Sequence, residues 1–493
     1  MDEKNSGKVF GVFILCVSIL SILQFSIKNI VGVDGLFHIK YASLILSEGI
    51  MRPFYWWSFA SYADTHFLYH VLLIPFTLFG LVEGAKISAI IFGGIAFSLM
   101  YWFLKKNKVE FPLFWVLSLF AFGSQALYRF MMPRAFTLAL ILFILGFYFM
   151  LEKKYKYLGI LLFLFVWSYT GFLILLFLIV LYFLYEWFVF GNKEWKLLSY
   201  SFIGTLLGSV INPFFPENIK TIYVQVVKVL LFPTDILLKS ADAQPYRSLG
   251  EIFHYFEFVS IVFVVCLFLY FKRKQFTNKV LSFMGIASIL TFVLVLKGVR
   301  FIEYWVPFTL MFGALTFSED LKRAYTKVIE IVEGKKIEFT RVKVIIILLI
   351  LLLPFLYIGL DEVKTQVIRG EEIKKFDSTL PCGRWLDKNT EKGSVVFNYW
   401  SEFPQVFIHD TNNKFIVGLD PNYMYHKNPE LYSKYEKILL IQTNETYDWI
   451  KNDFKANYIY LGSFTNKFKP YYDLFKGFEE VFSTPTCTVY KVK

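Results

Sequence analysis

The sequence predicts a polytopic α-helical membrane protein with a soluble α/β domain at its C-terminal end. Of its 493 residues, 56% are hydrophobic and 58 are phenylalanine, and the mean hydropathy is +0.51. A soluble chain of this size cannot bury so much apolar surface. The apolar runs stop near residue 360. We therefore expect a membrane domain over 1–360 and a soluble domain over 361–493.

Eleven apolar runs are long enough to be transmembrane helices. They lie at about 9–30, 85–104, 111–128, 134–151, 157–170, 171–190, 196–212, 252–271, 278–296, 300–317 and 343–360. Basic clusters such as 105–108 and 272–274 occur in every second connection, as cytoplasmic loops require. This alternation places the N-terminus in the cytoplasm and the C-terminal domain on the outer face.

The net charge of +12 is explained by these basic loops. No basic patch interleaved with aromatic residues stands apart from them, so we expect no nucleic-acid partner. The richness in lysine, isoleucine and phenylalanine is typical of an AT-rich prokaryote. The expected location is therefore the plasma membrane of a prokaryotic cell envelope.

Two further segments, 36–49 and 66–82, do not fit the alternation of sides. If 66–82 crossed the membrane, the basic loop at 105–108 would fall outside, against the positive-inside rule. This segment also contains Pro75, His66 and His70. We expect both segments to be juxtamembrane helices of the first outer loop.

Three segments are then left on the outer face: 31–66, 213–251 and the C-terminal domain. Long connections on one face of a membrane protein commonly carry its chemistry.

Two acidic residues, Asp34 and Asp64, lie in the first outer loop. An acid at the mouth of a transmembrane helix is costly unless it is paired or functional. A carboxylate at that depth can act as a general base or bind a divalent cation. The alternative for Asp34 is a helix N-cap, because it precedes an amphipathic run.

Histidines accompany both acids. His38 follows Asp34, and His66 follows Asp64. Asp64 and His66 are possible metal ligands. The alternative is that the histidines bond to neighbouring side chains or lipid head groups, since no third ligand is evident. Asp242 and Glu251 are further acidic candidates in the second long outer loop.

Basic residues also occur at the outer ends of spans, where they should be scarce. They are Arg129, Arg134, Lys297 and Arg300. Such side chains can bind a phosphate through charge-assisted hydrogen bonds. The alternative is snorkelling toward lipid head groups, and Glu303 could neutralise Arg300.

The C-terminal domain alternates strands and turns. Strands are expected at 394–398, 415–419, 458–461 and 488–492, and helices at 430–440 and 446–455. Cys382 and Cys487 bracket the domain and could pair outside the cytoplasm. The segments 398–402 and 418–425 combine aromatic and polar residues, which suits sugar contacts but equally suits turn and core positions.

The stretch 34–49 resembles the first outer loop of the GT-C superfamily of membrane glycosyltransferases. In oligosaccharyltransferase catalytic subunits this loop carries an acid, then an aromatic-histidine stretch, then an amphipathic helix that ends in glycine. The stretch 63–80 is similar to an element of the aminoarabinose and protein-mannosyl transferases, with Thr65, His66 and Phe67 in place of their prolines.

This resemblance implies a glycosyltransferase that uses a polyprenyl-phosphate or polyprenyl-diphosphate sugar donor. The acceptor would be a glycan, a lipid or a protein. It implies a catalytic role for Asp34 and a second acidic role for Asp64, with Glu251 in a loop similar to that of oligosaccharyltransferases. Arg134, Arg300 and Lys297 would then bind the donor phosphate. A divalent cation is a possible cofactor, although the short outer loop 124–133 has no Asp-x-Asp motif.

Two other classes are open. The chain could be a transporter or flippase of a lipid-linked substrate, but acids at the membrane midplane are sparse. It could also be a non-catalytic membrane scaffold whose soluble domain binds a partner. A phosphate-binding glycine loop, a nucleophile elbow and a metalloprotease helix are all missing from the sequence.

Overall fold

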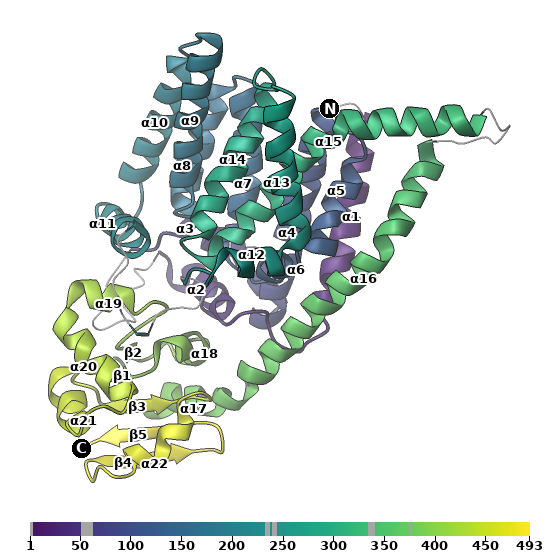
Figure 1. Ribbon diagram of the computed structural model, residues 1–493. Helices are drawn as coiled ribbons and strands as arrows, with labels where there is room; N and C mark the ends of the chain where they lie inside the picture. The colour runs from purple at the N-terminus through teal and green to yellow at the C-terminus, as the bar shows by residue number, and fades with distance from the viewer. Residues whose placement is uncertain (1–2, 51–62, 232–236, 239–243, 334–340, 375) are drawn as a thin grey trace. The chain divides into compact units, whose positions relative to one another are not determined.

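The computed structural model describes residues 3–50, 63–231, 237–238, 244–333, 341–374 and 376–493 (Figure 1). The chain divides into two compact units. Unit 1 comprises 1–26, 89–208 and 242–367, and unit 2 comprises 27–88, 209–241 and 368–493. Each unit is made of three segments that are far apart in the sequence, whereas the sequence analysis divides the chain once, at residue 360. The domain boundary at residue 360 stays a prediction.

Unit 1 is helical throughout the residues described. Its helices are α1 (Glu3–Gln24), most of α4 (Leu81–Lys106), α5 (Pro112–Phe122), α6 (Ser124–Phe130), α7 (Ala135–Leu151), α8 (Tyr155–Ser168), α9 (Phe172–Phe190), α10 (Trp195–Val210), α12 (Leu249–Tyr255), α13 (Glu257–Lys272), α14 (Lys279–Val295), η5 (Val299–Phe301), α15 (Ile302–Glu333) and most of α16 (Arg341–Lys374). Each of the eleven apolar runs coincides with one of these helices or with an adjacent pair.

Length and composition qualify three of the described helices as membrane spans: Ser6–Gln24, Leu81–Lys106 and Phe172–Phe190. Two bent pairs raise the number to five if each pair is one span. They are α5 with α6, bent by 92°, and α12 with α13, bent by 110°. The other apolar helices are shorter, so the count of eleven spans stays a prediction.

Helices α13 and α14 each pack along α15 in unit 1 (Figure 1). A glycine permits one close approach: a Cβ at Gly313 of α15 would lie 2.9 Å from the Trp115 ring and 2.7 Å from Val262. The Trp115 ring occupies the space that a side chain at position 313 would need. The glycine therefore allows the indole to pack directly against the backbone of α15.

Unit 2 contains a five-stranded mixed sheet with the order β2-β1-β3-β5-β4. The strands are β1 (Val395–Phe397), β2 (Lys414–Phe415), β3 (Tyr458–Leu461), β4 (Phe478–Ser483) and β5 (Thr488–Val492). β1 is parallel to β2 and β3, whereas β5 is antiparallel to β3 and β4. The predicted small α/β domain is thus present.

The remaining elements of unit 2 are helical. They are α2 (Asp34–Glu48), α3 (Phe67–Leu73), η2 (Ile74–Phe79), α11 (Glu217–Tyr223), η3 (Val224–Leu231), α17 (Phe376–Asn389), η6 (Trp400–Glu402), α18 (Phe403–Phe407), α19 (Asn422–Lys427), α20 (Pro429–Leu439), α21 (Thr446–Asp448), η7 (Trp449–Asp453), η8 (Asn466–Phe468) and α22 (Lys469–Tyr472).

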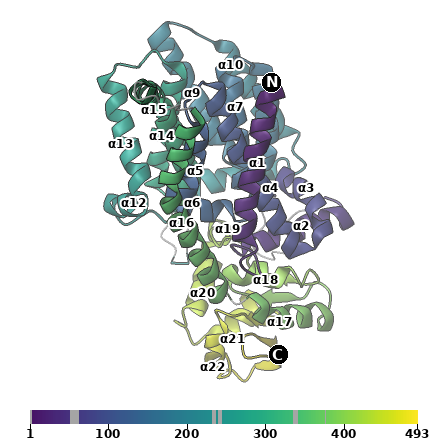
Figure 2. The same ribbon diagram turned by 90° about the vertical axis from the view of Figure 1, so that its right-hand side faces the viewer.

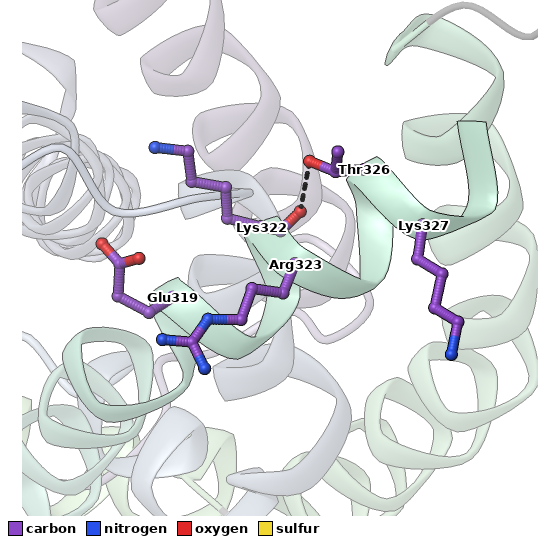
Figure 3. A pocket seen from close by; sticks show the side chains of 5 residues that line it. All are labelled: Glu319, Lys322, Arg323, Thr326 and Lys327. Carbon is purple, nitrogen blue, oxygen red and sulfur yellow. Dashed lines mark hydrogen bonds between the residues drawn. The ribbon is translucent and has the colours of Figure 1, made fainter. Parts of the chain in front are cut away.

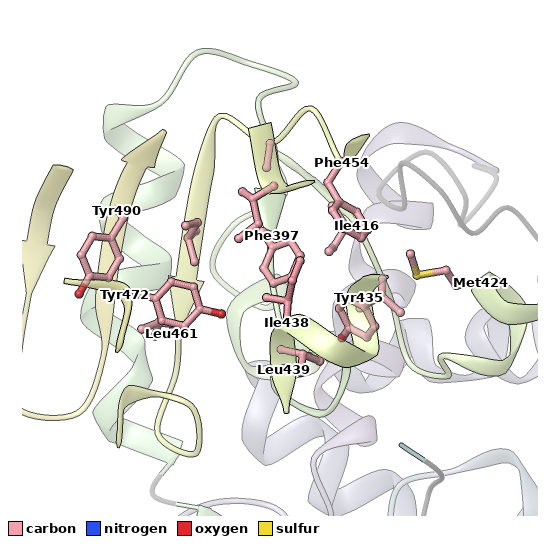
Figure 4. Close-up of a cluster of buried hydrophobic side chains, with 14 of the residues drawn as sticks. Phe397, Ile416, Met424, Tyr435, Ile438, Leu439, Phe454, Leu461, Tyr472 and Tyr490 are labelled. Carbon is pink, nitrogen blue, oxygen red and sulfur yellow. The ribbon is translucent and has the colours of Figure 1, made fainter. Parts of the chain in front are cut away.

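Successive side chains of a strand point to opposite faces of its sheet. Alternate residues of β1 and β3 therefore belong to two different hydrophobic cores. Phe397 and Ile459 belong to a core with Tyr435 and Ile438 of α20 (Figure 4). Their strand neighbours Val396 and Tyr460 join the other core, which also contains residues of α17 and α18.

The first outer loop completes this second core. Phe37, Tyr41 and Leu44, on one face of α2, pack with Phe403 and Phe407 of α18. The first outer loop and the C-terminal domain therefore fold as one body, joined by the segment 209–241. Most of the three segments predicted to lie on the outer face fall in this single unit.

A disulfide joins Cys382 of α17 to Cys487, which immediately precedes β5; their Cα atoms are 6.2 Å apart. The pairing considered from the sequence is thus present. It closes a sequence separation of 105 residues and lies within the second core.

Candidate active site

Asp34 is the first residue of α2. Val33 occupies the N-cap position, and its own side chain makes no capping hydrogen bond. The N-cap interpretation of Asp34 is therefore wrong. Its carboxylate lies in the first turn, where the positive end of the helix dipole favours a negative charge.

Asp64 is 3% exposed and lies in the turn before α3. Its Oδ1 accepts a hydrogen bond from the backbone N–H of His66 at 2.8 Å, and its Oδ2 lies 2.7 Å from Nδ1 of His70. Both carboxylate oxygens of Asp64 thus have partners close by in the sequence.

His70 connects Asp64 to helix α2. Its Nε2 lies 2.8 Å from Nδ1 of His38, and the two histidines are 1% and 4% exposed. The ring of Tyr41 packs edge-on against His70 at 4.7 Å, and that of Tyr69 against His38 at 5.6 Å. Figure 2 shows the two helices, α2 and α3, next to each other.

The second long outer loop fixes the turn that carries Asp64. The backbone N–H of Ala63 donates to Oγ1 of Thr221 at 2.9 Å. Nε2 of Gln225 also donates to Oγ1 of Thr65, at 3.5 Å. Residues on both sides of Asp64 are therefore tied to α11 and η3.

Metal binding by Asp64 and His66 stays a prediction. Across the described ranges, no group of three or more His, Cys, Asp or Glu side chains is arranged to bind a metal. The backbone of His66 and the ring of His70 already bond to the two oxygens of Asp64.

Unit 1 contains a second cluster, built around a buried ion pair. Nε of Arg129 donates to Oε2 of Glu303 at 3.0 Å, and the side chains are 7% and 1% exposed. Glu303 thus bonds to Arg129. The guanidinium groups of Arg129 and Arg134 also both make cation–π contacts with the ring of Phe136.

Tyr169, the residue that follows α8, lies near these charged groups. Its hydroxyl interacts electrostatically with Arg300, Arg134, Arg129 and Glu303. The structure therefore brings together Arg134 and Arg300, which are far apart in the sequence. Guanidinium groups are suited to binding an anionic ligand such as a phosphate through charge-assisted hydrogen bonds.

The end of the second outer loop borders the same region. The backbone N–H of Val299, beside Arg300, donates to the carbonyl of Gln244 at 3.0 Å, and the hydroxyl of Tyr246 donates to Gln125 at 3.1 Å. Lys297 is exposed at the end of α14, so nothing places it in this arginine cluster.

Of the remaining candidates, Asp242 lies outside the described residues. Glu251 helps to cap α12: its Oε2 accepts from the backbone N–H of Arg247 at 2.7 Å, while its own N–H donates to Oγ of Ser248 at 3.2 Å. This reciprocal arrangement resembles a capping box and accounts for Glu251 structurally.

The polar-aromatic segments of the C-terminal domain follow β1 and β2. Within them, Glu402 is buried and accepts hydrogen bonds from the backbone N–H groups of Gly462, Phe464 and Thr465. Burial raises the pKa of Glu402. Asn398 donates to the carbonyl of Val417 at 3.0 Å. These contacts favour the turn-and-core interpretation for Glu402 and Asn398.

A pocket of about 420 Å³ lies on the second half of α15, lined by Glu319, Lys322, Arg323, Thr326 and Lys327 (Figure 3). This segment belongs to a connection that the sequence predicts to be cytoplasmic. None of the candidate site residues lines the pocket, so we assign it no part in the site.

Sequence reasoning missed two residues of these clusters in their structural roles. His70 was visible one turn after His66, but its contact with His38 spans 32 positions of the chain. Tyr169 carries no motif at all. Its place at the end of an apolar run, beside outer-face arginines, is the only signal that could have indicated it.

No protein-family description matches this chain, and no curated protein sequence does. Solved structures do match. The archaeal oligosaccharyltransferase AglB from Archaeoglobus fulgidus, solved with an inhibitory peptide and a dolichol-phosphate, is 12% identical with a TM-score of 0.65, covering 98% of this chain and 74% of that one. An Archaeoglobus fulgidus oligosaccharyltransferase solved with Zn and sulfate is 12% identical with a TM-score of 0.60, covering 91% of this chain and 67% of that one.

A second kind of transferase has the same fold. ArnT from Cupriavidus metallidurans, solved with undecaprenyl phosphate, is 12% identical with a TM-score of 0.55, and the match covers 98% of both chains. The chain therefore has the fold of the GT-C membrane glycosyltransferases, and the resemblance noted in the sequence is confirmed at the level of the fold.

Proposed function

We propose that this chain is a membrane glycosyltransferase that moves a sugar from a polyprenyl-phosphate or polyprenyl-diphosphate carrier to an acceptor on the extracytoplasmic face. The observation that carries this proposal is the cluster of Arg129, Arg134 and Arg300 around Tyr169. Guanidinium groups gathered at the expected outer ends of apolar helices suit a lipid-linked phosphate. Two structures with a similar fold were solved with dolichol-phosphate and with undecaprenyl phosphate.

Asp34 is the proposed general base. Its carboxylate takes the proton of the acceptor hydroxyl or amide as the oxygen or nitrogen attacks the anomeric carbon of the sugar. The bond from that carbon to the phosphate oxygen breaks, and the oxygen leaves with the electron pair. Arg134 and Arg300 stabilise the charge that develops on the departing phosphate.

The orientation of the C-terminal domain is supported by its disulfide. Cys382 and Cys487 are both fully buried, and disulfides persist in oxidising compartments outside the cytoplasm. We propose that unit 2 lies on the outer face of a prokaryotic plasma membrane and that the N-terminus is cytoplasmic. The lipid-linked donor and the acceptor then both bind from the extracytoplasmic face.

The proposal is tested in proteoliposomes that contain purified protein, a radiolabelled polyprenyl-phosphate or polyprenyl-diphosphate sugar, and candidate glycan, lipid and peptide acceptors. Transfer of label to an acceptor supports the proposal. If labelled lipid crosses the bilayer while no acceptor is labelled with any donor, the chain is a flippase and the proposal is wrong.

A further inference from the structure

The pocket on the second half of α15 is lined mainly by cations. Its volume is about 420 Å³, and the side chains around it are those of Glu319, Lys322, Arg323, Thr326 and Lys327 (Figure 3). Their spacing of three and four residues brings them to one face of the helix. The three cationic side chains are exposed. None of them is in an ion pair within the described residues.

The opposite face of this segment is apolar and turned toward the protein. Leu321 and Tyr325 are four residues apart and half-buried. The ring of Tyr325 packs edge-on against Phe111, with the centroids 6.0 Å apart. The segment is therefore amphipathic, and its cations are on the side that faces away from the interior of unit 1.

The pocket begins where the apolar part of α15 ends. From Ile302 to Leu321 the helix has about 20 residues, or about 30 Å of length. This is the thickness of the hydrocarbon core of a bilayer. Because α15 starts beside Arg300, the pocket lies one membrane thickness away from the arginine cluster, at the depth of the opposite head groups.

Two other basic connections meet α15 at the same end. Nη1 of Arg273, between α13 and α14, donates to Oδ2 of Asp320 at 2.7 Å. The backbone N–H of Glu110, between α4 and α5, donates to Oγ of Ser318 at 3.0 Å. Both connections contain basic clusters and are predicted to be cytoplasmic. These contacts therefore place the pocket on a cationic end of unit 1.

We propose that this pocket binds the head group of an anionic phospholipid in the leaflet opposite to the arginine cluster. Lys322, Arg323 and Lys327 bind the phosphate oxygens through charge-assisted hydrogen bonds. The carboxylate of Glu319 and the hydroxyl of Thr326 accept hydrogen bonds from hydroxyl groups of the head group. The site favours a head group with both an anionic phosphate and hydroxyls, such as that of phosphatidylglycerol.

This inference goes beyond the proposed function and needs no sugar transfer. A phospholipid, and not a soluble phosphate, is the expected ligand because the pocket is at the end of an apolar helix, at the depth of the head groups. The pocket also differs from the donor site, since none of its residues belongs to the arginine cluster.

The test is native mass spectrometry of the full-length protein in a neutral detergent, titrated with phosphatidylglycerol or with phosphatidylcholine. We expect the wild-type protein to prefer phosphatidylglycerol. Arg323→Gln should lower the affinity for phosphatidylglycerol about fivefold, the effect of one cation beside an anionic lipid surface. The triple variant Lys322→Gln, Arg323→Gln, Lys327→Gln should bind the two lipids alike. Equal affinities in the wild-type protein would overturn the inference.

A matched variant separates the pocket from the total charge. Lys156→Gln, Lys193→Gln and Lys196→Gln together remove three exposed charges outside the pocket and should leave the lipid preference unchanged. An equal loss in the two triple variants would overturn the site. Lys322→Arg with Lys327→Arg keeps the charge and should keep the preference, so its loss there would count against binding by charge.

A soluble phosphate distinguishes the source of the ligand. Glycerol phosphate, added at the concentration of the lipid, should not displace phosphatidylglycerol from the wild-type protein. Displacement would show a site for soluble anions and overturn the lipid assignment. Since no measurement here depends on sugar transfer, failure of this inference leaves the proposed function untouched.

Discussion

Arg129 donates to Glu303 across 3.0 Å in the interior of unit 1, and both side chains are almost fully buried. Arg129 belongs to the same cluster near Tyr169 as Arg134 and Arg300. The ion pair is therefore a buried structural contact within that cluster.

Glu303→Gln should destabilise the protein by about 3–5 kcal/mol, because the change leaves a buried guanidinium without its carboxylate. Thermal unfolding in detergent, followed by size-exclusion chromatography, measures the effect. The matched control is Asp320→Asn, which breaks the partly exposed pair of Arg273 and Asp320 and should cost about 1 kcal/mol or less. Equal effects of the two substitutions would contradict the structural role of Glu303.

The two arginines should act on the lipid-linked donor. Arg134→Ala and Arg300→Ala are each expected to weaken donor binding or slow phosphate departure by about 10-fold or more, since a charge-assisted hydrogen bond contributes about 1.5–3 kcal/mol. Lys297→Ala should have a smaller effect, because Lys297 is exposed. Initial rates at varied donor concentration measure both changes. An effect of Lys297→Ala larger than that of Arg300→Ala would contradict this assignment.

The disulfide of the C-terminal domain gives a prediction about stability and location. In a background with Cys16→Ala and Cys266→Ala, which removes the two buried free cysteines, the protein should bind no thiol reagent until it is reduced and two equivalents afterwards. Replacing Cys382 and Cys487 by serine should cost about 2–5 kcal/mol. Thiols reactive without reduction in protein from intact membranes would argue against an oxidising location.

Two neighbouring residues of the C-terminal domain, His409 and Asp410, have pKa values that are shifted in opposite directions. Burial raises the pKa of Asp410 from the ordinary 3.8 to about 6, with a smaller contribution from Asp387. Burial lowers the pKa of His409 from 6.5 to about 4, with help from Arg384 and Lys40. Between pH 4 and 6 the folded state binds more protons at Asp410, so stability falls as pH rises. At His409 the folded state binds fewer protons than the unfolded state, so this residue makes stability rise as pH rises.

These opposing dependences should largely cancel in the native domain. Asp410→Asn removes the contribution of Asp410 and leaves the pH dependence of His409. The free energy of unfolding of the full-length variant should therefore rise by about 2–3 kcal/mol between pH 4 and 6.5. His409→Gln should do the opposite and make stability fall between pH 4 and 6. Unfolding in urea at a series of pH values measures both. Parallel pH profiles for the two variants would show that the assignment is wrong.

Much of the fold could be predicted from the sequence, because hydropathy and turn residues act locally. All eleven apolar runs became helices or adjacent helix pairs, and the strands predicted at 394–398, 458–461 and 488–492 are present. The strand predicted at 415–419 is reduced to Lys414–Phe415. Strand β4 was missed because it carries exposed Glu479 and Glu480 at a sheet edge. The 92° bend between α5 and α6 at Gly123 was also missed, since it lies inside one apolar run.

The clusters were less predictable, because they depend on contacts between distant segments. Asp64 and His66 were identified as neighbours in sequence, but the contact of His70 with His38 requires α2 and α3 to pack together. The packing of α2 into the core of the C-terminal domain could not be seen either. Phe37 and Tyr41 read as interfacial residues, yet their partners Phe403 and Phe407 lie more than 350 positions away.

The most direct test of the account is the rate of sugar transfer by Asp34→Asn in proteoliposomes. The matched control is Glu48→Gln, which removes an exposed carboxylate from the other end of the same helix. Loss of a general base should slow transfer by about 10²–10⁴-fold with donor binding and stability unchanged, while Glu48→Gln should transfer at the wild-type rate. Transfer by Asp34→Asn within a few fold of wild type would contradict the central claim that α2 carries the catalytic carboxylate.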